Sequence, residues 1–190
     1  MLPFIDVWET INTIPGWLHI DDARILYYLA SDLSGERSII EVGTFCGRSA
    51  VLFALASKCR IFCIDPMIVG PDDANHMTIT EDDIQRLKDN ITHYPQIEWA
   101  RIASSDFKPS EGWQLPAPGG MIYIDANHQY PHPKEDFLAF HRYLSPGAAV
   151  AFHDYGKTFP GVKQAIHELE EEGYLHSGRP SGSLYIATYR

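Results

Sequence analysis

Short apolar runs alternate with amphipathic segments along most of the chain. The apolar runs have the length of buried strands and cover residues 38–42, 60–64, 97–103, 120–125 and 147–152. The segments between them carry apolar residues at helical spacing and predict helices over 48–57, 81–94, 133–144 and 161–172. Apolar strands that alternate with amphipathic helices predict a parallel sheet covered by helices on both faces.

The two ends of the chain depart from this alternation. Residues 1–18 are rich in large apolar side chains without a clear period, and we expect them to be irregular. A helix follows, with Asp21 or Asp22 as its N-cap. At the other end, residues 173–177 and 183–189 predict two strands joined by a turn. A terminal hairpin of this kind is not typical of a simple dinucleotide-binding fold.

The most informative motif is Ile-Ile-Glu-Val-Gly-Thr-Phe-Cys-Gly-Arg-Ser, residues 39–49. An apolar run ends in Glu41, and Gly43, Gly47 and Ser49 follow, which predicts a strand, a tight turn and a helix start. Glycines let the backbone approach a ligand closely, and a helix N-terminus offers free N–H groups to an anion. The spacing differs from the Gly-x-Gly-x-x-Gly that binds a dinucleotide pyrophosphate. An acid at the strand end would repel a pyrophosphate but attract an ammonium group, so the motif favours a ligand with an amine and a carboxylate on one carbon.

This motif resembles the first motif of class I S-adenosylmethionine-dependent methyltransferases, in the form found in catechol-type and macrolide-type O-methyltransferases. The resemblance implies that Glu41, Gly43, Thr44 and Gly47 hold the methionine end of the cofactor and that Ser49 binds its carboxylate. It also implies the family's α/β fold, a Rossmann-like, doubly wound sheet of seven mostly parallel strands with an antiparallel C-terminal hairpin. The alternative is a plain strand–turn–helix of some other α/β protein.

Two further segments fit the cofactor site of the resembled family. The strand 60–64 is followed by Asp65, at the distance from the glycine turn where a carboxylate can accept ribose hydroxyl groups. The resemblance implies that Asp65 binds the ribose and that Ser104 and Ser105 lie near the adenine. Without the resemblance, Asp65 is more simply a cap and the serines form a turn.

The segment after the strand 120–125 carries the candidate catalytic residues. Its sequence, Asp-Ala-Asn-His-Gln-Tyr from Asp125, resembles the Asp-Gly-Asp-His-Ser-Tyr pattern of a subfamily that includes macrolide sugar O-methyltransferases. Ligands in open α/β sheets bind beyond the carboxyl ends of strands, so we assign Asp125 to the cofactor site. The resemblance implies that His128 is the general base, helped by Asp154. The alternative is a loop histidine that binds the backbone.

The strand 147–152 ends in His153 and Asp154, which raise the question of a metal ion. In metal-dependent relatives, acids at this strand end join the preceding aspartate to hold Mg²⁺. The resemblance therefore implies Asp125, His153 and Asp154 as metal ligands. His153 stands where macrolide-type enzymes carry a glutamate, and imidazole suits zinc, iron or nickel better than magnesium. A divalent metal ion thus stays open, with substrate contacts as the alternative role of these residues.

The composition limits the partners and the location of the protein. The chain has 190 residues and a formal net charge of -10 at pH 7, without a basic run, so nucleic acid and anionic membranes are poor partners. The first residues resemble no signal peptide, no apolar stretch is long enough to span a membrane, and the three cysteines are expected to be reduced. We therefore expect a cytoplasmic protein with one methyltransferase domain over residues 1–190, which leaves open a homo-oligomer. Its first 35 residues are expected to pack over the cofactor side, with the loop 66–79 as a candidate lid.

The predicted function is methyl transfer from S-adenosylmethionine to a small-molecule acceptor. A hydroxyl oxygen is the expected acceptor atom, by analogy with the resembled family alone. Two alternatives remain: a protein that binds the cofactor without catalysis, and an enzyme that uses NAD or another nucleotide. The glycine spacing and the C-terminal hairpin count against the second alternative.

Overall fold

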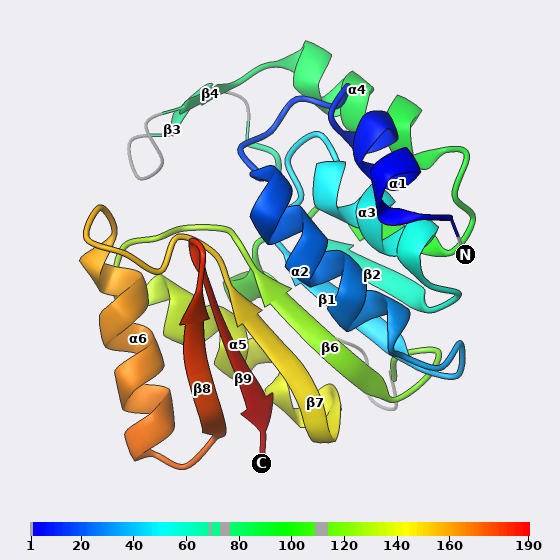
Figure 1. The fold of residues 1–190 in the computed structure, drawn as a ribbon. Helices are drawn as coiled ribbons and strands as arrows, with labels where there is room; N and C mark the ends of the chain where they lie inside the picture. Colours follow the sequence, from blue (N-terminus) through cyan, green and yellow to red (C-terminus); the bar gives the residue numbers. More distant parts are fainter. Residues whose placement is uncertain (1, 69, 73–76, 109–113) are drawn as a thin grey trace.

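A seven-stranded sheet forms the centre of the protein (Figure 1), and its strand order is β5-β2-β1-β6-β7-β9-β8. The computed structural model describes residues 2–68, 70–72, 77–108 and 114–190. The strands are β1 (Ser38–Val42), β2 (Arg60–Ile64), β5 (Ile97–Ala100), β6 (Gly119–Ile124), β7 (Leu144–Phe152), β8 (Leu175–Ser181) and β9 (Leu184–Tyr189). The first five are parallel, and β9 lies antiparallel between β7 and β8. The predicted doubly wound sheet with an antiparallel C-terminal hairpin is confirmed.

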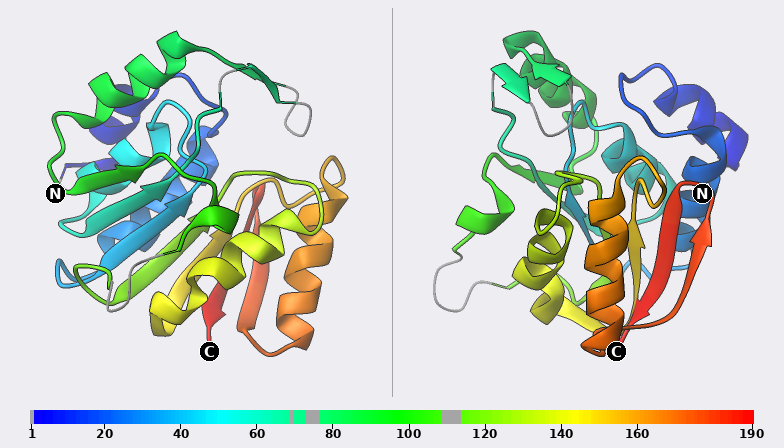
Figure 2. Two further views of the ribbon diagram at one scale, coloured as in Figure 1. Left: turned by 180° about the vertical axis from the view of Figure 1, so that it is seen from behind. Right: turned by 90° about the vertical axis from the view of Figure 1, so that its left-hand side faces the viewer.

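Helices cover both faces of this sheet (Figure 2). The helices are α1 (Phe4–Ile11), α2 (Ile20–Ser31), α3 (Arg48–Ala56), α4 (Glu81–Ile91), α5 (His132–Phe140) and α6 (Pro160–Glu171), with 3-10 turns at η1 (Ser104–Asp106) and η2 (His141–Tyr143). Side chains alternate between the two faces of a strand, so the neighbours Ile39 and Ile40 of β1 enter different cores. Ile39 packs in the core that includes residues of α1, α2 and α3, and Ile40 in the core that includes residues of α5 and α6.

The N-terminal segment, expected to be irregular, contains the helix α1. Phe4, Val7, Trp8 and Ile11 have the i, i+3, i+4, i+7 spacing of one helix face, and Val7 and Ile11 are fully buried. The abundance of aromatic and β-branched residues hid this period, because such residues have a modest helix propensity. The prediction of an irregular segment was therefore wrong.

The cap of α2 also differs from the expectation. His19 is its N-cap, and its Nδ1 accepts a hydrogen bond from the N–H of Asp21 at 3.4 Å. Asp21 and Asp22 lie inside the first turn of the helix, where negative charge is favourable. Asp22 is only 3% exposed, because its carboxylate is turned toward the β8–β9 turn.

Several other boundaries shift from the prediction. The strand expected over 97–103 ends at Ala100, the helix expected over 133–144 ends at Phe140, and β7 begins at Leu144. The loop expected over 66–79 contains two short antiparallel strands, β3 (Gly70–Asp72) and β4 (Met77–Ile79). Residues 69 and 73–76 of this candidate lid lie outside the described residues.

The C-terminal hairpin turns later than expected. Gly178 and Pro180 suggested a turn, yet β8 continues to Ser181 and the chain reverses at Gly182 and Ser183. A register shift in the β8–β9 ladder between His176 and Arg179 absorbs these residues without ending the strand. This later turn brings Ser183 to the carboxyl end of the neighbouring β7.

Within the described part of the chain, no helix combines the length and the apolar character needed to cross a bilayer.

Candidate active site

A cavity of about 1070 Å³ opens at the carboxyl ends of β1, β2, β6 and β7. Its volume suits a cofactor together with a second small molecule. Most of the predicted site residues line it: Gly43, Thr44, Ser49, Asp65, Ser104, Ser105, Asp125, His128, His153 and Asp154. Glu41 and Gly47 belong to the same motif but do not lie on its wall.

The glycine turn after β1 fits closely against the end of β6. Gly43 has a φ of +90°, and a Cβ atom added there would overlap the carbonyl of Asp125 and lie 2.7 Å from the nitrogen of Ala126. Gly47 is the N-cap of α3 in the left-handed region, with a φ of +86°. Both glycines are therefore required by backbone geometry, since such φ values are strained in other residues.

Asp65, expected to bind a ribose, accepts hydrogen bonds from the backbone of the glycine turn. Its Oδ2 accepts hydrogen bonds from the N–H groups of Thr44 and Phe45 at 2.7 and 2.8 Å, and its Oδ1 accepts one from Met67 at 2.8 Å. The residue thus acts as a cap for two loops, which was the simpler alternative at the sequence level. Asp65 also lines the cavity, and its predicted contact with a ribose stays a prediction.

Glu41 lies beneath the cavity and is fully buried in β1. Neither carboxylate oxygen has a hydrogen-bond partner of good geometry among the described residues. Burial raises the pKa of Glu41 to about 7, although Ser49, Cys63 and Thr44 lie close enough to limit the rise. The motif therefore places a carboxyl group at the strand end that is close to the border between its neutral and charged forms at neutral pH.

We expect this carboxyl group to make the protein less stable at higher pH. The pKa of Glu41 is higher in the folded protein than in the unfolded chain. The contribution of this carboxyl group to the free energy of unfolding is therefore fully present below the unfolded pKa and is lost as the pH rises through the folded pKa. Relative to Glu41→Gln, the wild type should lose roughly 2 to 3 kcal/mol of unfolding free energy between about pH 5 and pH 8. Urea unfolding of both proteins at these two pH values measures the change. A pH-independent difference between them would contradict the buried carboxyl.

Arg48, the residue before Ser49 in the motif, holds the N-terminal segment against α3. Its guanidinium donates hydrogen bonds to the backbone carbonyls of Ile11, Asn12, Gly16 and Leu18, at 2.8 to 3.2 Å. The guanidinium presents several N–H donors in a fixed fork, so one arginine can bind several carbonyls at once. Through these bonds the residues before α2 are held at the mouth of the cavity.

Replacing Arg48 by lysine should therefore loosen this segment while keeping the charge. An ammonium group cannot reach four carbonyls in the same geometry, so we expect a loss of about 1 to 3 kcal/mol in unfolding free energy. Arg24→Lys is the matched control, since Arg24 is exposed and pairs with Asp21 on the surface of α2. Denaturant unfolding of both variants checks the prediction, and equal losses in the two would contradict it.

One aromatic and one aliphatic side chain are exposed at the mouth of the cavity. Trp17 is 69% exposed and packs against Phe45 with 5.3 Å between the ring centroids, and Ile68 is 71% exposed. Both line the cavity. Large apolar side chains are rarely left exposed at a cavity without use, so they are candidate contacts for a bound ligand.

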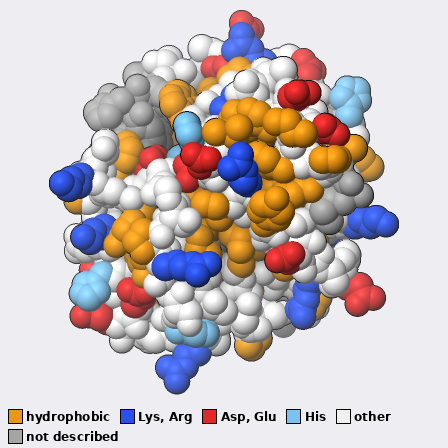
Figure 3. All heavy atoms as spheres, viewed as in Figure 1, with side chains coloured by type: hydrophobic (Ala, Val, Ile, Leu, Met, Phe, Trp, Pro, Cys, Tyr) orange, Lys and Arg blue, Asp and Glu red, His pale blue; other side chains and the backbone are white. Residues whose placement is uncertain are grey.

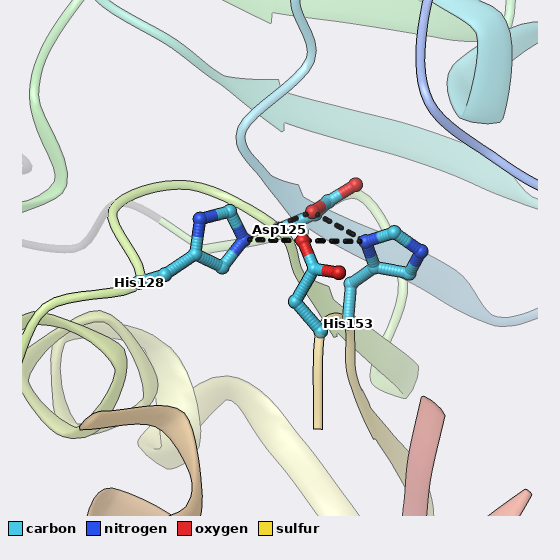
Figure 4. Close-up of side chains that lie close together, drawn as sticks. Asp125, His128 and His153 are labelled. Carbon is cyan, nitrogen blue, oxygen red and sulfur yellow. Dashed lines mark ion pairs between the residues drawn. The ribbon is translucent and has the colours of Figure 1, made fainter. Parts of the chain in front are cut away.

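Two histidines and two aspartates converge on one point at the carboxyl ends of β6 and β7 (Figure 4). His128 Nε2 lies 3.2 Å from Asp154 Oδ2 and 3.5 Å from Asp125 Oδ1. From the opposite side, His153 Nδ1 lies 3.0 Å from Asp125 Oδ1 and 3.3 Å from Asp154 Oδ2. The carboxylates thus lie between two imidazole rings, and the candidate ligand atoms all lie within 4.8 Å of one another.

Three of the four side chains of this cluster are oriented by a neighbour outside it. The Tyr123 hydroxyl donates to Asp125 Oδ2 at 2.9 Å, and Phe159 packs on the ring of His128 with 4.5 Å between centroids. His153 is 5% exposed, and its Nε2 lies 3.2 Å from the hydroxyl oxygen of Ser183. The cluster is therefore held in place before any ligand arrives.

The electrostatics of the cluster favour positive charge between the carboxylates. Burial lowers the pKa of His153, but the charges of Asp125 and Asp154 outweigh it and raise the pKa to about 11. Burial likewise raises the pKa of Asp125, yet His153 and His128 hold it well below its ordinary value. A metal cation bound between Asp125 and Asp154 would supply the positive charge that the protonated imidazoles otherwise provide.

The donor set decides which metal ion the cluster could hold. His153 Nδ1 is buried and makes no hydrogen bond of good geometry, although two carboxylate oxygens face it. Oxygen and imidazole donors together suit zinc, iron, cobalt or nickel, whereas Mg²⁺ prefers oxygen ligands alone. The residues present therefore fit a divalent transition ion and do not fit Mg²⁺. His128 Nε2, the atom expected to act as the base, lies beside the same point.

Asp136 and Ser183 also line the cavity but were not predicted. Asp136 of α5 is 4% exposed, accepts a hydrogen bond from the Ser104 hydroxyl, and has a pKa raised to about 6 by burial. Nothing in its local sequence distinguishes it from an ordinary helix acid. Ser183 was obscured because the turn was predicted too early in the chain.

The fold and the cavity together define the class of the protein. A doubly wound parallel sheet with one antiparallel strand next to the last parallel one, and a cavity at its carboxyl edge, is the class I methyltransferase fold. A family described as "Methyltransferase domain" matches residues 40–155, more than half of the chain. The chain belongs to this methyltransferase family, which confirms the resemblance inferred from its first motif.

Individual relatives are distant. An uncharacterised protein of Acanthamoeba polyphaga mimivirus is 25% identical over 149 residues, which cover 73% of this chain and only 63% of that protein's own length. The O-methyltransferase from Bacillus cereus in complex with SAH has a TM-score of 0.68 and 17% identity, covering 98% of this chain and 90% of that one. TomG, an O-methyltransferase from Streptomyces achromogenes involved in tomaymycin synthesis, in complex with SAM, has the same TM-score and identity, covering 98% and 87%. At these identities the structural similarity establishes the fold.

Proposed function

We propose that the protein transfers a methyl group from S-adenosylmethionine to a hydroxyl oxygen of a small molecule. The observation that carries this proposal is the cavity of a methyltransferase-family fold whose wall combines the motif after β1 with the cluster of Asp125, His128, His153 and Asp154. The motif suits the cofactor, and the adjacent cluster presents a base. The O-methyltransferases of similar fold, one with SAM and one with SAH, support the choice of cofactor and acceptor.

The cofactor contacts follow from the wall of the cavity. Thr44 and Ser49 offer hydroxyl groups beside the glycine turn for the amino-acid end of the cofactor. Asp65 has lone-pair capacity left on Oδ1 for a ribose hydroxyl, because the backbone uses only one of its two acceptor sites. Ser104 and Ser105 are then the expected neighbours of the adenine. Glu41 would act from below the wall, through Thr44 and Ser49, on the amino group.

His128 is the residue best suited to remove the acceptor's proton. S-adenosylmethionine supplies an electrophilic methyl group, so the protein needs only to align the acceptor, exclude water and take a proton. Nε2 of His128 faces the cluster, and Asp154 Oδ2 at 3.2 Å can accept the N–H that forms there. Phe159 fixes the ring from the side and shields it from water.

The same cluster is proposed to hold a divalent transition ion through Asp125, His153 and Asp154. Such an ion would lower the pKa of a hydroxyl group bound to it. Its ligands come from the ends of β6 and β7, two adjacent parallel strands, so the site is built on rigid elements. Tyr123 and Ser183 orient two of the three ligands.

Several observations favour a small-molecule acceptor over nucleic acid. The formal net charge is -10, and on the face seen in Figure 3 lysine and arginine side chains stand singly rather than in a patch. The exposed Trp17 and Ile68 at the mouth suit a ligand with an apolar part. All three cysteines are free and buried, in keeping with the proposed cytoplasmic location.

An acceptor panel tests the proposed reaction. The protein is incubated with S-adenosylmethionine and small aromatic and sugar-like scaffolds, each offered as the hydroxyl, the amine and the methyl ether, and S-adenosylhomocysteine is quantified. Turnover on hydroxyl compounds alone is the expected result. Turnover on amines alone would overturn the oxygen acceptor, and binding of S-adenosylhomocysteine without turnover on any scaffold would favour a binding protein.

A further inference from the structure

A chain of hydrogen bonds connects the helix α2 with the candidate metal cluster through the β8–β9 turn. The carboxylate of Asp22 accepts two bonds from Ser183, one from its N–H at 3.1 Å to Oδ1 and one from its O–H at 2.7 Å to Oδ2. The hydroxyl oxygen of Ser183 lies 3.2 Å from His153 Nε2. We call Asp22, Ser183 and His153 the α2–turn relay. It joins parts of the chain more than a hundred residues apart.

The direction of the bonds shows that Nε2 of His153 carries a proton. A carboxylate can only accept, so the hydroxyl proton of Ser183 points to Asp22. The oxygen of Ser183 is left with a lone pair for His153, which must donate to it from Nε2. The other ring nitrogen, Nδ1, then faces Asp125 and Asp154 at 3.0 and 3.3 Å.

The backbone around the turn is shaped for this contact. Gly182 has a φ of +65°, and a Cβ atom added there would overlap Oδ1 of Asp22, so only glycine allows the carboxylate so close. On the other side of the turn, the N–H of Tyr155 donates to the carbonyl of Ser183 at 2.8 Å, directly after Asp154 in the chain. The turn is therefore held both by α2 and by the segment that carries the cluster.

We propose that Asp22 and Ser183 are positioning residues that keep a proton on Nε2 of His153, so that Nδ1 is the ring nitrogen that binds the metal ion. The inference rests on the metal site of the proposed function. A histidine ligand whose other nitrogen donates to a polar group is fixed in ring orientation and tautomer, and the loss of that partner weakens metal binding. An imidazole ligand prepared in this way turns the cluster toward transition ions and away from Mg²⁺.

Binding of Co²⁺ to the full chain, followed by its visible absorbance, tests the inference. The wild type should bind Co²⁺ more tightly than Mg²⁺. Ser183→Ala should weaken Co²⁺ binding by about 10- to 100-fold, whereas Ser183→Thr, which keeps the hydroxyl, should bind nearly as the wild type does. Ser181→Ala, in the same hairpin but outside the relay, is the matched control. Ser183→Ala binding Co²⁺ as tightly as the control would overturn the inference.

Asp22→Asn gives a second and more specific test. An amide at this position can donate to the Ser183 oxygen, which lets the serine O–H turn to Nε2 and leaves the histidine protonated on Nδ1. We expect weaker Co²⁺ binding although size and fold are kept. This variant also decides the matter if Ser183→Ala does not fold. Co²⁺ binding equal to that of the wild type would contradict the relay.

The ¹⁵N shifts of the His153 ring separate the relay from the metal site. If the wild type binds no Co²⁺, the metal part of the proposed function fails, and the Nε2 shift alone decides the relay. A change in that shift on Ser183→Ala, with none on Ser181→Ala, would support the hydrogen bond. An Nε2 shift unaffected by Ser183→Ala would overturn it, whatever the metal result.

Discussion

Replacing His128 by alanine is expected to lower kcat by about 10²- to 10⁴-fold. The ring lies 3.2 Å from Asp154 and is packed on Phe159, so it is oriented to take a proton and to share it with a carboxylate. The proposed cofactor contacts Thr44 and Ser49 lie on another part of the cavity wall. The affinity for S-adenosylhomocysteine should therefore change by less than about threefold.

Steady-state kinetics and calorimetry of the same samples separate these two effects. His167→Ala is the matched control, since His167 is exposed on α6 and pairs only at the surface with Glu171, at 3.3 Å. The control should keep the kcat of the wild type. A kcat of His128→Ala close to that of the control would remove His128 from the mechanism, and a loss of cofactor affinity would assign it to binding instead.

Gly43→Ala is expected to cost about 2 to 5 kcal/mol of unfolding free energy and to abolish cofactor binding. The added methyl group meets the Asp125 carbonyl, which cannot move without shifting the end of β6. The φ of +90° adds the strain of a left-handed residue. The steric overlap and the backbone strain both arise where the ends of β1 and β6 together form the cavity wall, so we expect the cofactor site to be distorted.

Gly147→Ala separates the overlap from the backbone strain. Gly147 has a similar φ of +83° but no atom within 4 Å of an added Cβ, so only the strain applies. We expect this variant to lose about 1 to 2 kcal/mol and to bind S-adenosylhomocysteine normally. Denaturant unfolding and calorimetry measure both quantities. Equal losses in the two variants would mean that Gly43 is required for its φ alone.

Much of the fold could be predicted because its signals are local. The apolar runs that became β1, β2 and β6 are buried on both faces of a parallel sheet, and such strands stand out in a sequence. The glycine motif likewise lies in one continuous segment. The helix α1 was missed because its apolar spacing competes with a composition of low helix propensity.

The unpredicted parts of the site depend on contacts between distant segments. Asp22 has the sequence signature of a helix cap, and only the fold brings it to Ser183. Asp65 was expected to contact a ribose, yet its backbone bonds to Thr44 and Phe45 depend on how two loops meet. The four-residue cluster could be predicted in part, because Asp125 and Asp154 follow strands that lie side by side. That His128 turns toward both carboxylates depends on the loop after β6.

Calorimetric titration with S-adenosylhomocysteine, with NAD as the comparison and thermal unfolding in parallel, tests whether the protein uses S-adenosylmethionine. A ligand that binds only the folded protein stabilises it by about 2.7 kcal/mol at a hundred times its Kd. If the protein is a methyltransferase, we expect binding of S-adenosylhomocysteine, a raised unfolding temperature and no effect of NAD. Binding of NAD, or no binding of S-adenosylhomocysteine, would contradict it.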